Sequence, residues 1–181
     1  MALTSTMYNF QIELADMDRG VYSLIKCGAA MHPSETVDFM VTRVLAYCLE
    51  YQDGISFSKG LSDADEPAIW IKHPDGRILT WIEVGRPAAE RLHRASKQVE
   101  RLVVYTHKPP AIFLKQLEKE RIHKREIIPI YSFDTTFHNA MARFLERRNQ
   151  LAISVSDREI YLEMSGHHLR TPINEHRLPA E

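Results

Sequence analysis

Two short apolar runs joined by a turn constrain the fold of this chain more than any other feature of its sequence. Residues 68–72 (AIWIK) and 78–84 (ILTWIEV) have the length and the β-branched and aromatic side chains of buried strands. The link HPDGR contains Asp75-Gly76, and Asp-Gly between apolar runs is a strong signal for a β-hairpin with a two-residue turn. The sequence therefore predicts a hairpin whose register is set by that turn.

This register brings two carboxylates together at the end of the hairpin remote from the turn. Period-two alternation puts three facing pairs on one side of the hairpin, namely Trp70 with Trp81, Ala68 with Glu83, and Glu66 with Gly85. Glu66 and Glu83 are then diagonal neighbours, with Cβ atoms roughly 7–8 Å apart. Two carboxylates at that separation can share a divalent cation, which takes oxygen ligands at about 2.0–2.6 Å.

Glu83 stands among apolar residues of its strand, where a carboxylate is costly unless something compensates its charge. The compensation is either a metal ion shared with Glu66 or a cationic side chain. Residues 88–99 return to helical spacing after the strand, and Arg91 and Gln98 border the buried stripe of that helix, within reach of the carboxylates. Lys97 falls almost opposite the stripe and is predicted to be solvated.

Helical periodicity is clearest before the hairpin, in the segment that begins with HPSET. Apolar residues recur there at helical spacing, at Val37, Met40, Val41, Val44, Leu45, Cys48 and Leu49. Ser34 is the predicted N-cap. Glu35 then lies in the first turn, where the helix dipole favours a negative charge.

The remaining elements complete a single α/β domain over residues 1–181. The core order is α–β–β–β–α–β, a mixed sheet flanked by helices, with additional strands at both ends of the chain. The predicted elements outside the hairpin and the first helix are strands at 3–14 and 21–30, a short strand in ISFSKG, a strand at 101–107, a helix at about 110–120, a strand at 126–131, a helix from Asp134 to about 147, a hairpin at 151–164 and an irregular tail.

Composition excludes several classes of protein. No apolar run approaches the roughly 20 residues that cross a bilayer, so no membrane partner is expected. The first residues have neither a basic leader nor a long apolar core, so no signal peptide is expected. The net charge of −1 gives no global positive field, and a nucleic-acid site would have to be a local basic patch. Cys27 and Cys48 lie among apolar neighbours, which indicates buried thiols and a cytoplasmic location.

The motifs HPSET, GLSDADEPAIW, WIEVGRP, ERLHRASKQ and VVYTH resemble those of the YaeQ family along nearly the whole chain. That family is described as a variant of the PD-(D/E)XK nuclease fold, the restriction-endonuclease-like core, whose element order is also α–β–β–β–α–β. The resemblance implies that Glu35 is the acidic residue of the first core helix. It implies that Asp65 or Glu66 is the acid at the second core strand, that Glu83 is the acid of the (D/E)XK element, and that Gln98 is the polar residue of the next helix.

The chain departs from that pattern at the lysine, because the element reads Glu83-Val84-Gly85. Lys72 shares the face of Glu66, but six residues of strand separate the two by about 20 Å. Lys59 precedes GLSDADEP in a loop. Arg91 has the reach and can stabilise a developing oxyanion, but its guanidinium stays protonated and is no base.

Three classes of function remain open from the sequence. The first is a metal-dependent nuclease-like phosphodiesterase with Mg²⁺ or Mn²⁺ on Glu66 and Glu83, with Asp65 as a further candidate ligand, Glu35 as an outer ligand or water-positioning residue, and Arg91 as a charge stabiliser. The second is a nucleic-acid or protein binding module without catalysis. The third is unrelated small-molecule chemistry. The histidines show no zinc-site spacing, and no glycine-rich phosphate loop or GxSxG motif is present.

Overall fold

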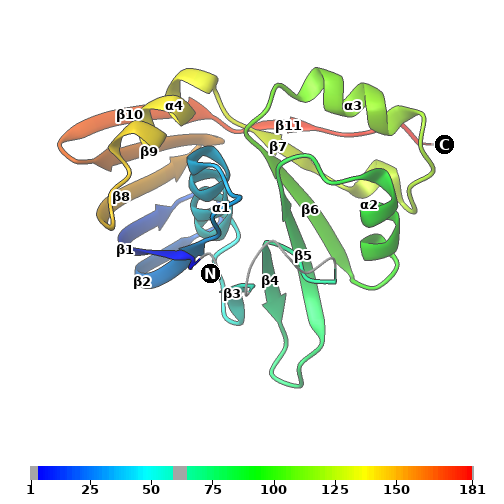
Figure 1. Cartoon of the computed structure of the whole chain (residues 1–181), viewed down its shortest axis with the longest axis horizontal. Helices are drawn as coiled ribbons and strands as arrows, with labels where there is room; N and C mark the ends of the chain where they lie inside the picture. The colour runs from blue at the N-terminus through cyan, green and yellow to red at the C-terminus, as the bar shows by residue number, and fades with distance from the viewer. Residues whose placement is uncertain (1–3, 59–64, 181) are drawn as a thin grey trace.

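The two ends of the chain build one sheet together. The computed structural model describes residues 4–58 and 65–180. A five-stranded sheet has the order β10-β9-β8-β1-β2, with β1 parallel to β8 and the other pairs antiparallel (Figure 1). Its strands are β1 (Thr6–Asp16), β2 (Val21–Met31), β8 (Arg148–Ser156), β9 (Glu159–Met164) and β10 (His167–Pro172). The additional terminal strands therefore form a sheet of their own.

The middle of the chain forms a second, six-stranded sheet. Its order is β11-β7-β6-β5-β4-β3, with β6 parallel to both β5 and β7. The strands are β3 (Ile55–Phe57), β4 (Ile69–Lys72), β5 (Ile78–Val84), β6 (Arg101–Thr106), β7 (Ile130–Ser132) and β11 (Asn174–His176). The elements from α1 to β6 follow the order α1–β3–β4–β5–α2–β6, which is the predicted order of the core.

Four α-helices and one short 3₁₀ helix, η1, occur in the described part of the chain. They are α1 (Val37–Leu49), α2 (Ala89–Ser96), α3 (Pro110–Glu118), η1 (Arg125–Ile127) and α4 (Thr135–Phe144). In Figure 1, α1 lies between the two sheets, while α2 and α3 lie on the far side of the six-stranded sheet. None of the helices in the described residues is long and apolar enough to span a membrane.

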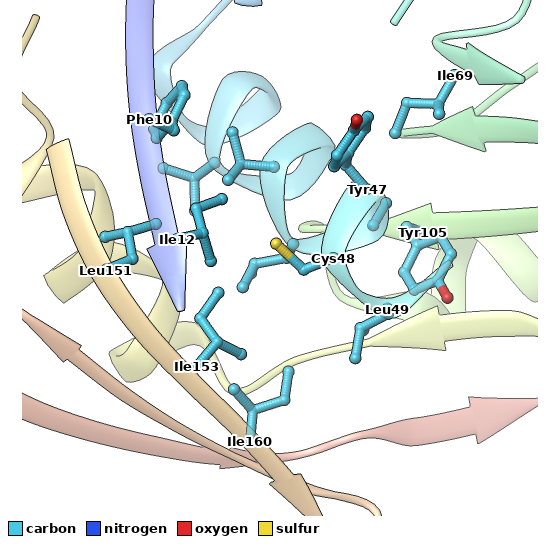
Figure 2. Packing of buried hydrophobic residues seen from close by; sticks show 14 of the residues in the cluster. Phe10, Ile12, Tyr47, Cys48, Leu49, Ile69, Tyr105, Leu151, Ile153 and Ile160 are labelled. Atoms are coloured by element: carbon cyan, nitrogen blue, oxygen red, sulfur yellow. The ribbon is translucent and has the colours of Figure 1, made fainter. Parts of the chain in front are cut away.

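The position of α1 explains where the main core lies. All of residues 40–49 are buried, because both sheets and α4 cover the helix. Figure 2 shows Ile12 and Ile153 of the five-stranded sheet on one side of α1 and Ile69 and Tyr105 of the six-stranded sheet on the other. Full burial of such an aliphatic or aromatic side chain contributes about 1.5–3 kcal/mol. One continuous cluster therefore holds the two sheets together.

A separate cluster packs α2 and α3 onto the other face of the six-stranded sheet. Trp81 of β5 and Val104 of β6 contact this cluster, whereas Ile82 and Val103 belong to the main core. Alternate residues of each strand thus face opposite layers, as a sheet covered on both sides requires. Glu83 follows the direction of Trp81 and points toward α2.

The predicted hairpin has the expected pairing of Trp70 with Trp81 but a different turn. His73 donates its backbone N–H to Arg77 over 2.9 Å, so the loop contains three residues rather than two. Gly76 has φ +92°, the conformation that glycine adopts most readily in a three-residue hairpin loop. A β-bulge at the Ile71/Lys72 step offsets the extra loop residue, and the register beyond it is the predicted one.

Several predicted boundaries are wrong. Thr36, not Ser34, caps α1: its hydroxyl accepts from the backbone N–H of Phe39 over 3.2 Å, so Glu35 precedes the helix instead of lying in its first turn. The predicted strand at 126–131 divides into η1 and the short β7. The last helix ends at Phe144 because β8 begins at Arg148, and the tail predicted to be irregular pairs as β10 and β11.

Candidate functional site

A cavity of about 450 Å³ lies where β5 ends, and it gathers most of the predicted site residues. Neighbouring parallel strands β5 and β6 both end there, and such carboxyl ends are where α/β sheets bind ligands. The N-terminal part of α1 and the start of α2 reach the same place from opposite faces of the sheet. The charged or titratable residues that line the cavity are Glu35, Arg43, Glu66, Glu83, Arg86, Arg91, His107 and Lys108.

Glu83 is compensated by two donors on its own side of the sheet. Only 5% of the residue is exposed. Its Oε1 accepts from the indole Nε1 of Trp81 over 2.6 Å and from the Nε of Arg91 over 2.6 Å. Burial raises the pKa of Glu83, while the indole and the guanidinium act in the opposite direction. The cationic partner that the sequence predicts at Arg91 is therefore present.

Arg91 also ties the second carboxylate residue to the cavity. Its Nη2 donates to the backbone carbonyl of Glu66 over 2.5 Å, and its guanidinium lies 5.7 Å from the centre of the Trp81 ring. Glu66 is half-buried in the segment that leads into β4, and it lines the same cavity as Glu83. One guanidinium thus fixes the Glu66 backbone relative to the Glu83 side chain.

Glu35 forms a second buried ion pair with a residue that sequence analysis missed. Its Oε1 lies 3.0 Å from Nη1 of Arg43, and the two side chains are 1% and 2% exposed. Arg43 also donates to the carbonyl of Ala30, and the backbone N–H of His32 donates to Glu35. Burial raises the pKa of Glu35 and lowers that of Arg43. Helical spacing does not identify Arg43 as a buried residue, because α1 is covered on all sides and not along one stripe.

Two predicted site residues lie outside the cavity. Asp65 is exposed and pairs with Arg94, 3.2 Å away, rather than lining the cavity beside Glu66. Gln98 lies beyond the end of α2, where it is exposed and its backbone N–H donates to the carbonyl of Ala95. The predicted helix at 88–99 ends at Ser96, so Gln98 is not placed on the face that Arg91 shares. Lys59 lies outside the described residues.

His107 and Lys108 are cavity residues that sequence analysis did not select. They directly follow β6, and a parallel pairing of β5 with β6 places them beside the end of β5. The parallel pairing of these two strands was the signal that could have identified both residues. Burial lowers the pKa of His107 to about 4, and neighbouring His138 contributes in the same direction. The two imidazole rings stack with centres 5.6 Å apart, and the buried Nδ1 of His107 has no hydrogen-bond partner among the described residues.

The carboxylates at the cavity could hold a divalent ion only if water or substrate supplies its remaining ligands. Over residues 4–58 and 65–180, no group of three or more His, Cys, Asp and Glu side chains is arranged to hold a metal. Mg²⁺ is commonly bound by one or two carboxylates, with water and substrate phosphate completing its octahedron. Glu66 and Glu83 supply that number of carboxylates at the cavity. Glu35 and Glu83 each already have an arginine partner.

Fold and site together define a class: mixed α/β proteins with two sheets around a central helix and a charged cavity at the strand ends. The family described as "YaeQ protein" matches residues 1–173, and the chain belongs to this family. "Uncharacterized protein YaeQ" of Escherichia coli (strain K12) is 28% identical over 182 residues, with 99% of this chain and all of the relative covered. That of Salmonella typhi is 26% identical, with the same coverage.

Solved structures of the family share this architecture. The crystal structure of YaeQ protein from Pseudomonas syringae is similar with a TM-score of 0.87 and 32% identity, over 98% of this chain and 97% of that one. The YaeQ protein from Xanthomonas axonopodis pv. citri has a TM-score of 0.85 and 24% identity, over 97% of this chain and all of that one. The two-sheet arrangement of this chain is therefore shared with both of these YaeQ structures.

Proposed function

We propose that this protein is a metal-dependent nuclease-like phosphodiesterase that acts on nucleic acid, built on a variant of the PD-(D/E)XK core. The observation that carries the proposal is the meeting of Glu66, Glu83 and Lys108 at one cavity. The order α1–β3–β4–β5–α2–β6, with the acids at the second and third of these strands, supports the placement in that superfamily.

Lys108 answers the main objection to catalysis, which is the missing lysine of the (D/E)XK element. Position 85 is glycine, but the adjacent parallel strand delivers a lysine to the same cavity. An ammonium group there can orient a water molecule and stabilise charge on a phosphoryl oxygen. Arg86, which is exposed at the cavity, adds a second cation that can hold the phosphodiester.

In the proposed site Glu66 and Glu83 hold Mg²⁺ or Mn²⁺, and Arg91 fixes their relative position. When bound, the ion lowers the pKa of a coordinated water and neutralises the scissile phosphate. Glu35 stays paired with Arg43, so its role is to position Arg43 at the cavity wall rather than to bind the ion directly. Asp65 is not assigned to the ion because it pairs with Arg94 outside the cavity.

The test is a calorimetric titration with Mg²⁺ and Mn²⁺, followed by cleavage assays on single-stranded, duplex and branched DNA. We expect one saturable ion site that is lost in Glu66→Gln and Glu83→Gln and kept in Glu13→Gln, a matched change of an exposed residue of β1. Cleavage that needs the ion and disappears in the same variants supports the proposal. No saturable binding at millimolar metal, with an unchanged circular dichroism spectrum, contradicts it.

A second candidate function is a nucleic-acid or protein binding module without catalysis. The observation that favours it is the pairing of both deeply buried carboxylates, Glu35 and Glu83, with arginines that neutralise them without a metal. In that case the cavity binds a phosphate through Arg86 and Lys108 and leaves it intact. Binding of oligonucleotides without metal, and no cleavage with it, distinguishes this candidate.

A further inference from the structure

A second cavity, of about 350 Å³, lies between the C-terminal end of α2 and the segment that connects α3 to η1. Three cationic residues, Lys97, Arg121 and Lys124, line it together with His93 and His123. Glu126 is the one acidic residue among its described lining residues. The cavity therefore carries an excess of positive charge on a protein whose net charge is −1.

The cations of this cavity differ from most arginines of the protein in having no acidic partner. Arg43, Arg91 and Arg101 each form an ion pair with a glutamate. Within the described residues, no carboxylate pairs with Lys97, Arg121 or Lys124. Their charges repel one another, and an anion placed between them would relieve that repulsion.

The segment that carries two of these cations is held in place before any ligand binds. Buried Arg125 donates through Nη1 to the backbone carbonyls of Glu118 and Glu120, at 3.2 and 3.1 Å. The backbone N–H of His123 donates to Nδ1 of His93 over 3.2 Å, which attaches the segment to α2. A backbone that is fixed in advance leaves only the side chains to be ordered when a ligand binds, which lowers the entropy lost on binding.

The same hydrogen bond determines how His93 can act toward a ligand. Because Nδ1 accepts from the His123 backbone, the ring proton of neutral His93 must lie on Nε2. His93 is therefore a fixed N–H donor at the wall of the cavity. It adds a neutral donor to three cationic ones, a combination that suits an oxyanion with several acceptor oxygens.

We propose that this cavity, the α2–η1 cavity, is a binding site for a phosphate group. It is separate from the cavity at the end of β5, since His93 and Arg91 are two positions apart on α2 and point about 160° apart around the helix axis. The inference does not depend on the proposed phosphodiesterase activity. The phosphate can belong to a small phosphorylated molecule or to the backbone of a nucleic-acid strand, because both present the same oxygens.

The first arm of the test titrates ¹⁵N-labelled full-length protein with inorganic phosphate at constant ionic strength and follows the amide signals of residues 121–124. We expect a saturable shift in the natural protein, and an affinity at least about tenfold weaker in the double variant Arg121→Gln/Lys124→Asn. Asparagine is chosen because Lys124 has φ 53°, a conformation that asparagine tolerates. Lys115→Gln/Arg147→Gln removes the same charge from exposed residues outside the cavity and should bind like the natural protein.

The second arm uses a fluorescent single-stranded oligonucleotide of about ten thymidines, without divalent metal. Weaker binding in the Arg121→Gln/Lys124→Asn variant, with a smaller salt dependence, assigns the phosphate to a strand. Unchanged oligonucleotide binding, with phosphate binding lost, assigns it to a small molecule. The proposal is overturned if phosphate gives no saturable shift at residues 121–124, or if both double variants weaken phosphate binding equally.

Discussion

The guanidinium of Arg91 lies 2.6 Å from the carboxylate of Glu83, and this pair joins α2 to β5 at the edge of the candidate site. The carboxylate is buried, whereas a quarter of the arginine side chain is exposed. The burial that raises the pKa of Glu83 makes its ionised form dependent on its partners. Removal of Arg91 would leave a buried carboxylate with only the indole of Trp81 as a donor among these contacts.

We therefore expect Arg91→Ala to lower the free energy of unfolding by about 2–3 kcal/mol. Arg94→Ala, on the same helix but in an exposed pair with Asp65, should cost no more than about 0.5 kcal/mol. Urea unfolding followed by circular dichroism measures both changes. Equal destabilisation by the two variants would mean that the Glu83 pair is not coupled to folding in this way.

The pair between Glu35 and Arg43 is more deeply buried and should be more sensitive to the loss of one partner. Arg43→Met keeps the apolar stem but leaves the Glu35 carboxylate without its cation, at an expected cost of about 3–5 kcal/mol. Glu35→Gln/Arg43→Met removes both charges and should recover most of that loss. Urea midpoints of the single and double variants give the coupling energy, and a double variant no more stable than Arg43→Met would contradict it.

The elements that could be predicted are those whose signal is local. The helical spacing from Val37 to Leu49, the hairpin of β4 and β5, and the buried run of β6 are all readable within short windows, and the structure contains each of them. The facing of Trp70 and Trp81 is correct even though the turn was not, because a β-bulge offsets the longer loop. Arg91 was also found from helical spacing alone.

The features that could not be predicted depend on partners distant in sequence. β1 pairs with β8 across most of the chain, and β11 gains its pairing from β7, so no local pattern marks these pairings. β10, in contrast, pairs with the adjacent β9, and the Ser165-Gly166 turn between them was a local signal that the sequence analysis did not use. The sequence alone places Arg43 on the polar side of an amphipathic helix, because the elements that cover that side are not evident from it. His107 and Lys108 follow a strand whose neighbour in the sheet decides that they reach the site.

Two glycines with positive φ provide a test of the hairpin geometry. Gly54 has φ +85° and Gly76 has φ +92°, so alanine is strained at both. A Cβ at Gly76 would meet open space, whereas one at Gly54 would overlap the backbone carbonyl oxygen of Lys72. We expect Gly76→Ala to cost about 1 kcal/mol and Gly54→Ala about 3 kcal/mol or more. Thermal unfolding measures both; similar costs would show that β4 does not approach Gly54 so closely.

His107 should make a contribution to stability that is lost as the pH is lowered. Its pKa is lowered to about 4 in the folded protein, while an unfolded histidine titrates near 6.5. The unfolded state therefore binds more protons between these values. This contribution is fully present above about pH 6.5 and is lost as the pH falls toward about 4. Glu35 and Glu83, whose pKa values are raised, act in the opposite sense, so only a difference between variants isolates the histidine.

His107→Phe keeps an aromatic ring beside His138 and removes the titrating group. The difference in unfolding free energy between pH 7.5 and pH 5 should be smaller in this variant than in the natural protein. His168→Phe changes an exposed histidine of β10 and should leave that difference unchanged. Urea midpoints at the two pH values provide the measurement. An unchanged difference in His107→Phe would show that the pKa of the half-buried His107 is not lowered in this way.

Lys108 provides the most direct test of the candidate site, because both proposed functions use its charge to hold a phosphate. The residue is exposed and lines the cavity at the end of β5, so its replacement should not affect folding. We expect Lys108→Gln to weaken binding of single-stranded and duplex oligonucleotides, and to reduce the slope of log affinity against log salt by about one. Lys115→Gln on α3, also exposed but outside that cavity, is the matched control. Fluorescence anisotropy over a range of salt concentrations measures both variants.

If Lys108→Gln and Lys115→Gln have the same slope as the natural protein, Lys108 holds no phosphate. If the slope changes in Lys108→Gln and metal-dependent cleavage falls by a larger factor than binding, the lysine acts on the transition state as well as on the bound strand.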